Sequence, residues 1–153
     1  MPTPKIHPFY RLWFTTIDPF VLIITVGVCI FSPSVILETF VSPSLVPYDS
    51  LSHGPLLWQS AALYAFMVVI FGGLLRASDD LKVWRIVQGA TLMVDIALLA
   101  TMWVVLKQQS RLEIGALKGG DWFNGGFTIW VAVIRAAFLS GIGVGEESKA
   151  KRR

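Results

Sequence analysis

The sequence predicts an all-α membrane protein built as a bundle of four transmembrane helices. Of its 153 residues, 54% are hydrophobic and 15% are charged, whereas a soluble domain carries about a quarter charged residues. The apolar residues gather in four blocks of about 20 residues, the length that crosses a bilayer core of about 30 Å. Each block is continuously apolar and does not alternate, which favours helices over the strands of a membrane barrel.

The four predicted spans belong to one domain over residues 1–145. They cover residues 12–31, 55–75, 83–106 and 122–144. The first span carries Asp18-Pro19 in its first turns and lacks a small-x-small cleavage site, so it is expected to be a retained helix and not a signal peptide.

The connections between the spans contain turn and capping signals. The Ser- and Pro-rich segment 32–54 predicts a loop with a short interfacial helix. In the tight turn 77–82, Ser78 or Asp79 is expected to cap the third helix, and Asp121 is expected to cap the fourth. Glycines at 72–73, 141, 143 and 145 indicate close approach between helices.

The distribution of lysine and arginine predicts that both termini are cytosolic. With the N-terminus in the cytosol, nine basic residues lie on the cytosolic side, in agreement with the positive-inside rule. They are Lys5, Arg11, Arg76, Lys82, Arg85, Lys149, Lys151, Arg152 and Arg153. The opposite side holds Lys107, Arg111 and Lys118. Five tryptophans near the span ends fit the headgroup region; they are Trp13, Trp58, Trp84, Trp103 and Trp122.

A basic cytosolic tail is predicted over residues 146–153. Its last five residues form a Lys-x-Lys-x-x pattern that resembles the dilysine signals that retrieve membrane proteins to the endoplasmic reticulum. The alternative is a basic anchor that contacts anionic lipid. The chain is therefore expected to be a multi-pass membrane protein of the endoplasmic reticulum.

The composition argues against several classes of site. Cys29 is the only cysteine, which excludes an internal disulfide and a multi-cysteine metal site. His7 and His53 lie outside the spans without a second ligand at metal spacing, so neither a metal nor another cofactor is expected. The formal charge is +3, but the basic residues form no stripe, so no nucleic-acid partner is expected.

Three ionisable residues lie inside the spans and are the candidate site: Asp18, Asp95 and Arg135. A charge at the centre of a membrane helix costs about 2.5–3.5 kcal/mol, so such residues usually face a bundle interior and pair. Asp95 and Arg135 lie on antiparallel helices and are both expected near mid-membrane. Asp18 is shallower, yet within reach of the long arginine side chain. We expect one shared cluster.

This cluster has two interpretations. In one, Arg135 neutralises Asp95 and holds the register of the last two helices, with no chemistry. In the other, the low dielectric favours the protonated form of one carboxyl group, which then acts as a general acid or base beside a lipid-accessible cavity. Asp18 is the better acid if Asp95 is the stricter partner of Arg135.

Further polar and aromatic residues are candidates for the lining of a substrate pocket. Gln88, Thr91 and Asp95 follow i, i+3, i+7 spacing and form one polar stripe. The other candidates are Gln59, Tyr64, Asn124 and Trp130. Aromatic faces can shield a cationic intermediate, although anchoring in lipid is the commoner role of such rings.

The chain resembles an uncharacterised, DUF7704-like family of small fungal multi-pass membrane proteins. The likeness spans most of the chain and rests on Tyr10-Arg11, Asp18-Pro19, an Asp-Leu-x-Val-Trp-Arg turn at 80–85, Asp95, Asp121-Trp122-Phe123-Asn124 and Arg135-Ala136-Ala137-Phe138-Leu139. It implies a fungal origin and work in secondary metabolism. A weaker analogy is to fungal membrane-bound meroterpenoid cyclases and sterol isomerases, which use intramembrane carboxylates to protonate an alkene or epoxide.

Two functional hypotheses follow. In the first, the protein acts on a lipophilic small molecule as a terpenoid-type cyclase or isomerase, with Asp18 and Asp95 as catalytic residues and Arg135 tuning their charge. In the second, it is a non-catalytic scaffold or accessory subunit whose Asp/Arg cluster is structural. The expected partners are the lipid bilayer, a lipophilic substrate, and a second copy or a partner enzyme.

Overall fold

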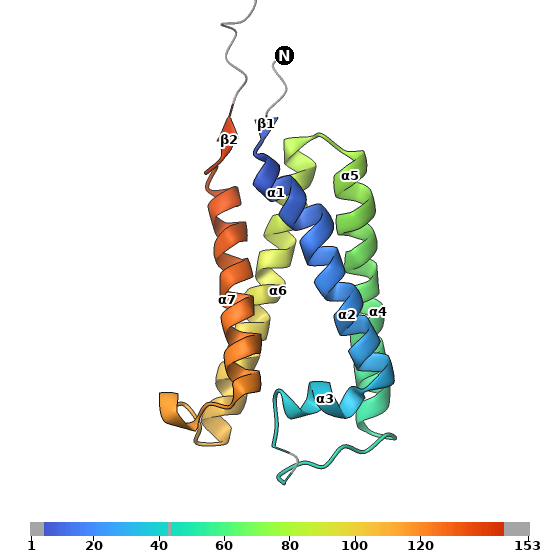
Figure 1. Cartoon of the computed structure of the whole chain (residues 1–153), viewed down its shortest axis with the longest axis vertical. Helices are drawn as coiled ribbons and strands as arrows, with labels where there is room; N and C mark the ends of the chain where they lie inside the picture. Colours follow the sequence, from blue (N-terminus) through green and yellow to red (C-terminus); the bar gives the residue numbers. More distant parts are fainter. Residues whose placement is uncertain (1–4, 43, 146–153) are drawn as a thin grey trace, which may run out of the picture.

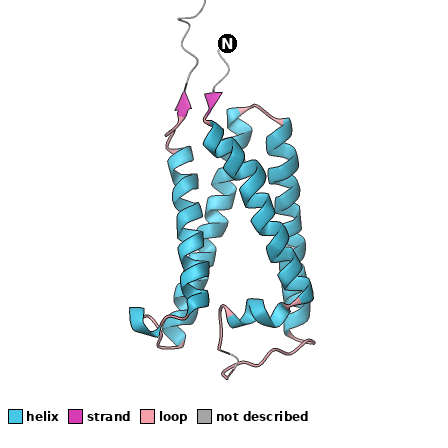
Figure 2. Cartoon of the chain, in the orientation of Figure 1, coloured by secondary structure: helices cyan, strands magenta, loops and turns pink. Residues whose placement is uncertain are grey.

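The computed structural model describes residues 5–42 and 44–145. Within them lie four helices that are long and apolar enough to cross a membrane, Pro8–Phe31, His53–Ala77, Leu81–Gln108 and Gly119–Leu139. The described chain is almost entirely helical (Figure 2). The prediction of an all-α fold with four candidate spans is thus confirmed. The predicted basic tail at 146–153 lies outside the described residues.

The first membrane helix consists of α1 (Pro8–Leu12), a π-helical turn (Trp13–Ile17) and α2 (Asp18–Phe31). It begins four residues earlier than predicted, because Pro8 at the first helical position suits a helix start. Pro19 explains the wider turn. Proline has no N–H to donate to Thr15, four residues back, and its ring crowds that carbonyl group. The N–H of Asp18 bonds instead to the carbonyl oxygen of Trp13, five residues back.

The second membrane helix has the same design. It comprises α4 (His53–Val69), a π-helical turn (Ile70–Leu74) and α5 (Leu75–Ala77), and it follows the short helix α3 (Pro33–Glu38). The turn contains Gly72-Gly73, but a Cβ on Gly72 would meet no atom within 4 Å. The predicted close helix approach at this pair is therefore wrong. Glycine pairs also favour local departures from α-helical geometry, which is the role they have here.

Before α4, the loop is closed by Asp49. Its carboxylate accepts hydrogen bonds from the hydroxyl and the backbone N–H of Ser52, and these bonds hold the pKa of Asp49 below its usual range. The loop is therefore organised by a charged carboxylate at neutral pH.

The third membrane helix, α6 (Leu81–Gln108), is capped by Asp80, whose carboxylate accepts from the N–H of Lys82. The predicted cap at Ser78 or Asp79 is wrong by one or two positions. Ser78 instead accepts from the N–H of Asp80, so it supports the residue that caps the helix.

The fourth membrane helix, α7 (Gly119–Leu139), follows a 3₁₀ turn (Ile114–Ala116). Asp121 accepts from the backbone N–H of Lys118 and so completes a capping arrangement at its start. The helix ends five residues before the predicted boundary at 144. Gly141 and Gly143 have φ of +87° and +72°, a conformation that side chains disfavour, and they end the helix.

Beyond α7, the chain continues into a strand that pairs with the start of the domain. Strand β2 (Val144–Gly145) runs antiparallel to β1 (Lys5–Ile6), with Ile6 opposite Val144. This two-stranded ribbon lies at one end of the bundle, called here the ribbon end; α3 lies at the opposite end (Figure 1).

The bundle is made of two helical pairs. One consists of the first membrane helix packed along α4, and the other of α6 packed against α7. The pairs come together at the ribbon end and diverge toward α3 (Figure 1). The buried core joins them at the ribbon end and contains Ile6, Tyr10, Phe14, Phe71, Leu75, Trp84, Ile134 and Phe138. Trp84 is fully buried here and donates its indole N–H to the carbonyl oxygen of Ser78, so its predicted headgroup role is wrong.

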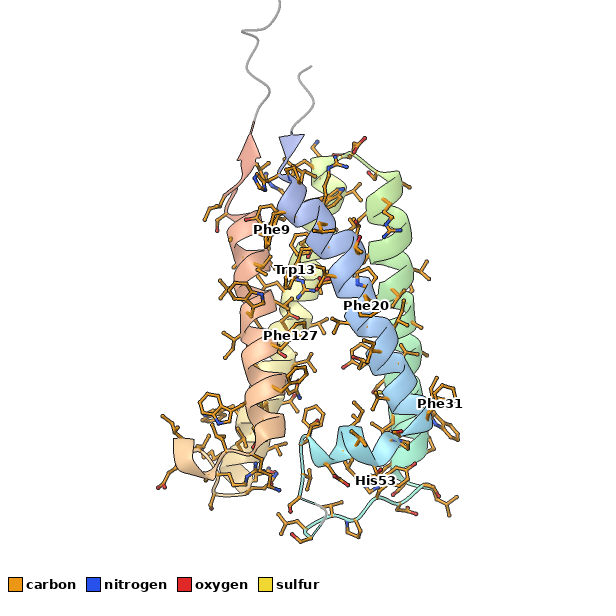
Figure 3. All side chains as sticks on the ribbon, in the orientation of Figure 1. Phe9, Trp13, Phe20, Phe31, His53 and Phe127 are labelled. Carbon is orange, nitrogen blue, oxygen red and sulfur yellow. The ribbon has the colours of Figure 1, made fainter. Side chains whose placement is uncertain are left out.

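Most remaining apolar side chains point outward along the helices (Figure 3). Phe20, Phe31, Leu63, Phe66, Ile86 and Met93 are examples, each more than half exposed. Such a surface is stable in hydrocarbon and not in water. The fold is therefore that of a multi-pass membrane protein surrounded by lipid.

Polar contacts close the α3 end. Gln109 donates from its amide nitrogen to the carbonyl oxygen of Phe40, which links the end of α6 to the α3 segment. Arg111 forms an ion pair with Asp121, which is buried at the start of α7.

The glycine turn gives a test of the ribbon. We expect Gly143→Ala to destabilise the fold most, because it adds left-handed strain of about 1–2 kcal/mol and places a Cβ 2.9 Å from Cε2 of Tyr10. Gly141→Ala adds strain without a clash, and Gly145→Ala adds neither. Thermal unfolding in detergent should rank the variants in that order. Equal Tm values for Gly143→Ala and Gly145→Ala would contradict this account.

Candidate functional site

Arg135 is the centre of a buried polar network. Its Nη1 donates to Oδ2 of Asp95 at 2.5 Å, and its Nη2 donates to Oδ2 of Asp18 at 2.7 Å. All three residues are buried, and only 4% of the surface of Arg135 is exposed. The network therefore joins α2, α6 and α7 through one guanidinium.

The two ion pairs have different structural roles. Asp95 lies on α6 and Arg135 on α7, so their bond holds two helices that already pack as a pair. Asp18 lies on the other helical pair, so its bond with Arg135 ties the two pairs together. Arg135 lies close to the end of α7, nearer that end than predicted. A helical side chain leans toward the N-terminus of its helix, and so the guanidinium extends deeper into the bundle than its Cα.

Two further side chains complete the surroundings of the guanidinium. Gln88, fully buried, accepts a hydrogen bond at Oε1 from Nε of Arg135 at 3.1 Å. The ring of Phe71 faces the guanidinium at 5.9 Å from its centroid, within the range of a cation–π interaction. Arg135 is thus held by two carboxylates, one amide and one aromatic face.

Both π-helical turns lie beside this network. Asp18 directly follows the first turn, and Phe71 lies within the second. The two turns contact each other across the first helical pair. Arg76 crosses the same contact and donates from Nη2 to the carbonyl oxygen of Thr15 at 2.7 Å, the carbonyl group to which Pro19 cannot donate. Single π turns occur frequently at functional sites, because they re-aim side chains locally.

Aromatic rings flank the Asp18 side of the network. Trp13 lies one helical turn before Asp18, with its indole nitrogen near that carboxylate but without a hydrogen-bond partner. Its ring meets Trp130 of α7 edge to face, with centroids 6.4 Å apart. Trp130 is itself half exposed to the surroundings of the bundle. Trp13 therefore lies between the buried charges and a ring that faces lipid.

Not all predicted pocket residues reach the network. Gln88 does, and Thr91 is buried beside it but donates its hydroxyl to the carbonyl oxygen of Val87 in its own helix. Gln59 is exposed on the outside of α4, which is a correction to its expected place in a pocket. Tyr64 and Asn124 are half-buried and make no contact with the three charged residues among the hydrogen bonds of the described chain.

Phe71 and the two π turns were not predicted as parts of the site. The aromatic ring of Phe71 sits in an apolar span where nothing in the sequence separates it from lipid-facing neighbours. Pro19, four residues after Thr15, was a readable signal for the first turn. Over residues 5–42 and 44–145, no group of three or more His, Cys, Asp and Glu side chains comes together in a way that could hold a metal ion.

Residues 3–145 match a family described as a domain of unknown function (DUF7704). No curated protein and no solved structure matches the chain.

Removing the shared cation tests the energetics of the network. We expect Arg135→Gln to lower the free energy of unfolding by about 3–5 kcal/mol, because two buried carboxylates then lose their counter-charge. Asp95→Asn should cost less, since Arg135 keeps Asp18 as a partner. The measurement is thermal unfolding in detergent, with exposed Arg85→Gln on α6 as the control. If Arg135→Gln unfolds at the temperature of this control, the network does not stabilise the fold.

Proposed function

We propose that this chain, which belongs to the DUF7704 family, acts on a lipophilic small molecule by acid–base chemistry inside the membrane. The observation that carries the proposal is the excess of carboxylates: Asp18 and Asp95 share the single guanidinium of Arg135. Two ionised carboxylates and one guanidinium would leave a surplus negative charge in a buried site, which is costly. One bound proton removes that surplus, so the network is suited to hold a transferable proton.

In the proposed mechanism, Asp18 is the acid. Asp95 makes the shorter bond with Arg135 and shares its helical pair, so Asp18 is the carboxyl group that more readily carries the proton. Asp18 gives its proton to an alkene carbon or an epoxide oxygen of the substrate. The resulting cation cyclises or shifts its double bond, and it then loses a different proton to Asp95. The substrate keeps its composition, as in a cyclase or isomerase, and Arg135 stabilises whichever carboxylate is ionised.

Aromatic rings supply the second requirement of such a reaction. A carbocation formed near Asp18 would lie close to Trp13, whose ring face can stabilise positive charge. The contact between Trp13 and half-exposed Trp130 offers a lipophilic substrate a route from the bilayer.

A second candidate function has an observation in its favour. Both carboxylates already bond to Arg135, and the Asp18 bond joins the two helical pairs. This is the arrangement expected of a non-catalytic scaffold or accessory subunit whose charges are structural. In that case a partner enzyme or a second copy of the chain would use the lipid-facing surface.

The cellular setting is part of the proposal. The excess of basic residues at the ribbon end and in 149–153 favours cytosolic termini and residence in the endoplasmic reticulum. A fungal origin and a role in secondary metabolism are proposed from the sequence likeness, and the analogy with meroterpenoid cyclases suggests a terpenoid-type substrate.

The topology can be tested with single cysteines. In a Cys29→Ser background, Ala77→Cys and Leu51→Cys place thiols at exposed positions on opposite ends of the bundle. In sealed microsomes, an impermeant maleimide should label Ala77→Cys directly and Leu51→Cys only after permeabilisation. The reverse pattern would invert the proposed orientation.

Metabolite profiling tests the chemistry. A deletion strain is complemented with wild type, Asp18→Asn or Asp95→Asn, and the membrane level of each protein is measured. We expect Asp18→Asn to accumulate normally and to leave a lipophilic precursor unconverted, because an amide donates no proton to an alkene. Thr91→Val, a change at a buried neighbour of the network, is the control. Full restoration of the profile by both Asn variants would replace the enzyme proposal with the scaffold.

A further inference from the structure

The side-chain amide of Gln88 forms a hydrogen bond through its oxygen but not through its nitrogen. Its Oε1 accepts from Arg135, but its Nε2 is buried and has no hydrogen-bond partner. Oxygen and nitrogen of an amide share one carbon, so the two N–H donors of Nε2 lie beside the same charged network. An unpaired buried donor costs about 1–3 kcal/mol, and native proteins rarely retain one without a reason.

A second unpaired donor lies at the same ion pair. The indole Nε1 of Trp13 is buried, has no partner and lies near Asp18, the residue that Arg135 binds through Nη2. Gln88 and Trp13 come from different helical pairs, α6 and the first membrane helix. Donors without partners therefore approach the Asp18–Arg135 pair from both halves of the bundle.

This arrangement has a definite chemical preference. Amide and indole N–H groups donate and do not compete with the carboxylates for a proton. Gln88 therefore lacks an acceptor for Nε2, and Trp13 has only the nearby Asp18 carboxylate, which lies outside hydrogen-bond geometry. The Trp13 ring itself supplies apolar surface beside its N–H. The complementary ligand is apolar over most of its length and carries an acceptor oxygen at one end, as in an alcohol, ketone or epoxide.

We propose that Gln88 and Trp13 form the recognition site for that oxygen, and that they position the lipophilic substrate with its oxygenated end against Asp18. The inference rests on the proposed function and names its substrate class. Gln88 is a positioning residue in this scheme, because Asp18 carries the proton. A purely hydrocarbon substrate would leave the donors of Gln88 and Trp13 unsatisfied, so the site selects against it.

A trapped water molecule is the alternative acceptor for the same N–H donors, because its oxygen accepts hydrogen bonds as a ligand oxygen does. A water would satisfy Gln88 in the free protein and would give no preference for one lipophilic molecule over another. Water and ligand oxygen are therefore separated by comparing two ligands that share a carbon skeleton, one with an oxygen and one without.

The test uses farnesol and farnesene, which share a fifteen-carbon isoprenoid skeleton; farnesene lacks the hydroxyl group and has one more double bond. Each is added to the full-length protein in detergent micelles, and the change in Tm is measured. For the wild type we expect farnesol to raise Tm by about 3 °C or more and farnesene to raise it distinctly less. Equal shifts, or no shift with either compound, overturn the assignment and leave a trapped water as the occupant.

Variants locate the effect. Gln88→Met removes the amide and Trp13→Phe removes the indole N–H, and the Tm of each ligand-free variant shows whether its fold is kept. Both variants should reduce the farnesol–farnesene difference to less than half. The matched controls are Thr91→Val and Trp58→Phe, a ring on α4 that is more than half exposed, and both should keep the wild-type difference. An undiminished difference in both Gln88→Met and Trp13→Phe overturns the proposal.

The outcome is independent of the metabolite experiment. If conversion requires Asp18 but farnesol and farnesene bind alike, the acid–base function stands and the oxygen site fails. If farnesol is preferred through Gln88 but Asp18→Asn restores the profile, the protein binds oxygenated lipids without converting them.

Discussion

The bundle depends on one guanidinium that is shared by two carboxylates. Arg135 holds Asp95 within its own helical pair and Asp18 across to the other pair, so a single side chain sets the register of three membrane helices. In hydrocarbon, apolar packing discriminates poorly between helix and lipid. A buried ion pair is geometrically demanding, and it therefore supplies a specificity that the outward-facing apolar side chains cannot. The apolar core at the ribbon end reinforces the same contact between the two pairs.

Pro19 connects this network to the backbone. The residue after Asp18 cannot donate to Thr15, and the helix widens by one residue at that place. The freed carbonyl oxygen is bonded by Arg76 from the end of the second membrane helix. One covalent feature thus positions the carboxylate, opens a hydrogen-bond acceptor and joins two helices. The second π turn, at Gly72-Gly73, lies against the first and carries the ring that faces Arg135.

Much of the fold was predictable, because hydrocarbon imposes length and continuity on each span. The contact of Asp18, Asp95 and Arg135 could also be anticipated from charge and depth alone. Side-chain direction was harder to predict: Gln59 points outward, and Trp84 is buried although its position suggested the headgroup region. Hydropathy is nearly uniform around these helices, so it does not show which face meets a neighbour. The end of α7 was missed because an apolar run continues past Leu139, whereas the glycines at 141 and 143 leave helical geometry and end the helix.

The two residues of the ion pair that joins the helical pairs are synthesised at different times. Asp18 and Arg135 lie 117 positions apart, in the first and the last membrane helix. A ribosome completes the first helix long before the residue that neutralises its carboxylate exists. During that interval Asp18 has no counter-charge, at an insertion cost of up to about 2.5–3.5 kcal/mol. The ion pair that joins the two helical pairs therefore forms only after α7 has been made, as a late step in assembly of the bundle.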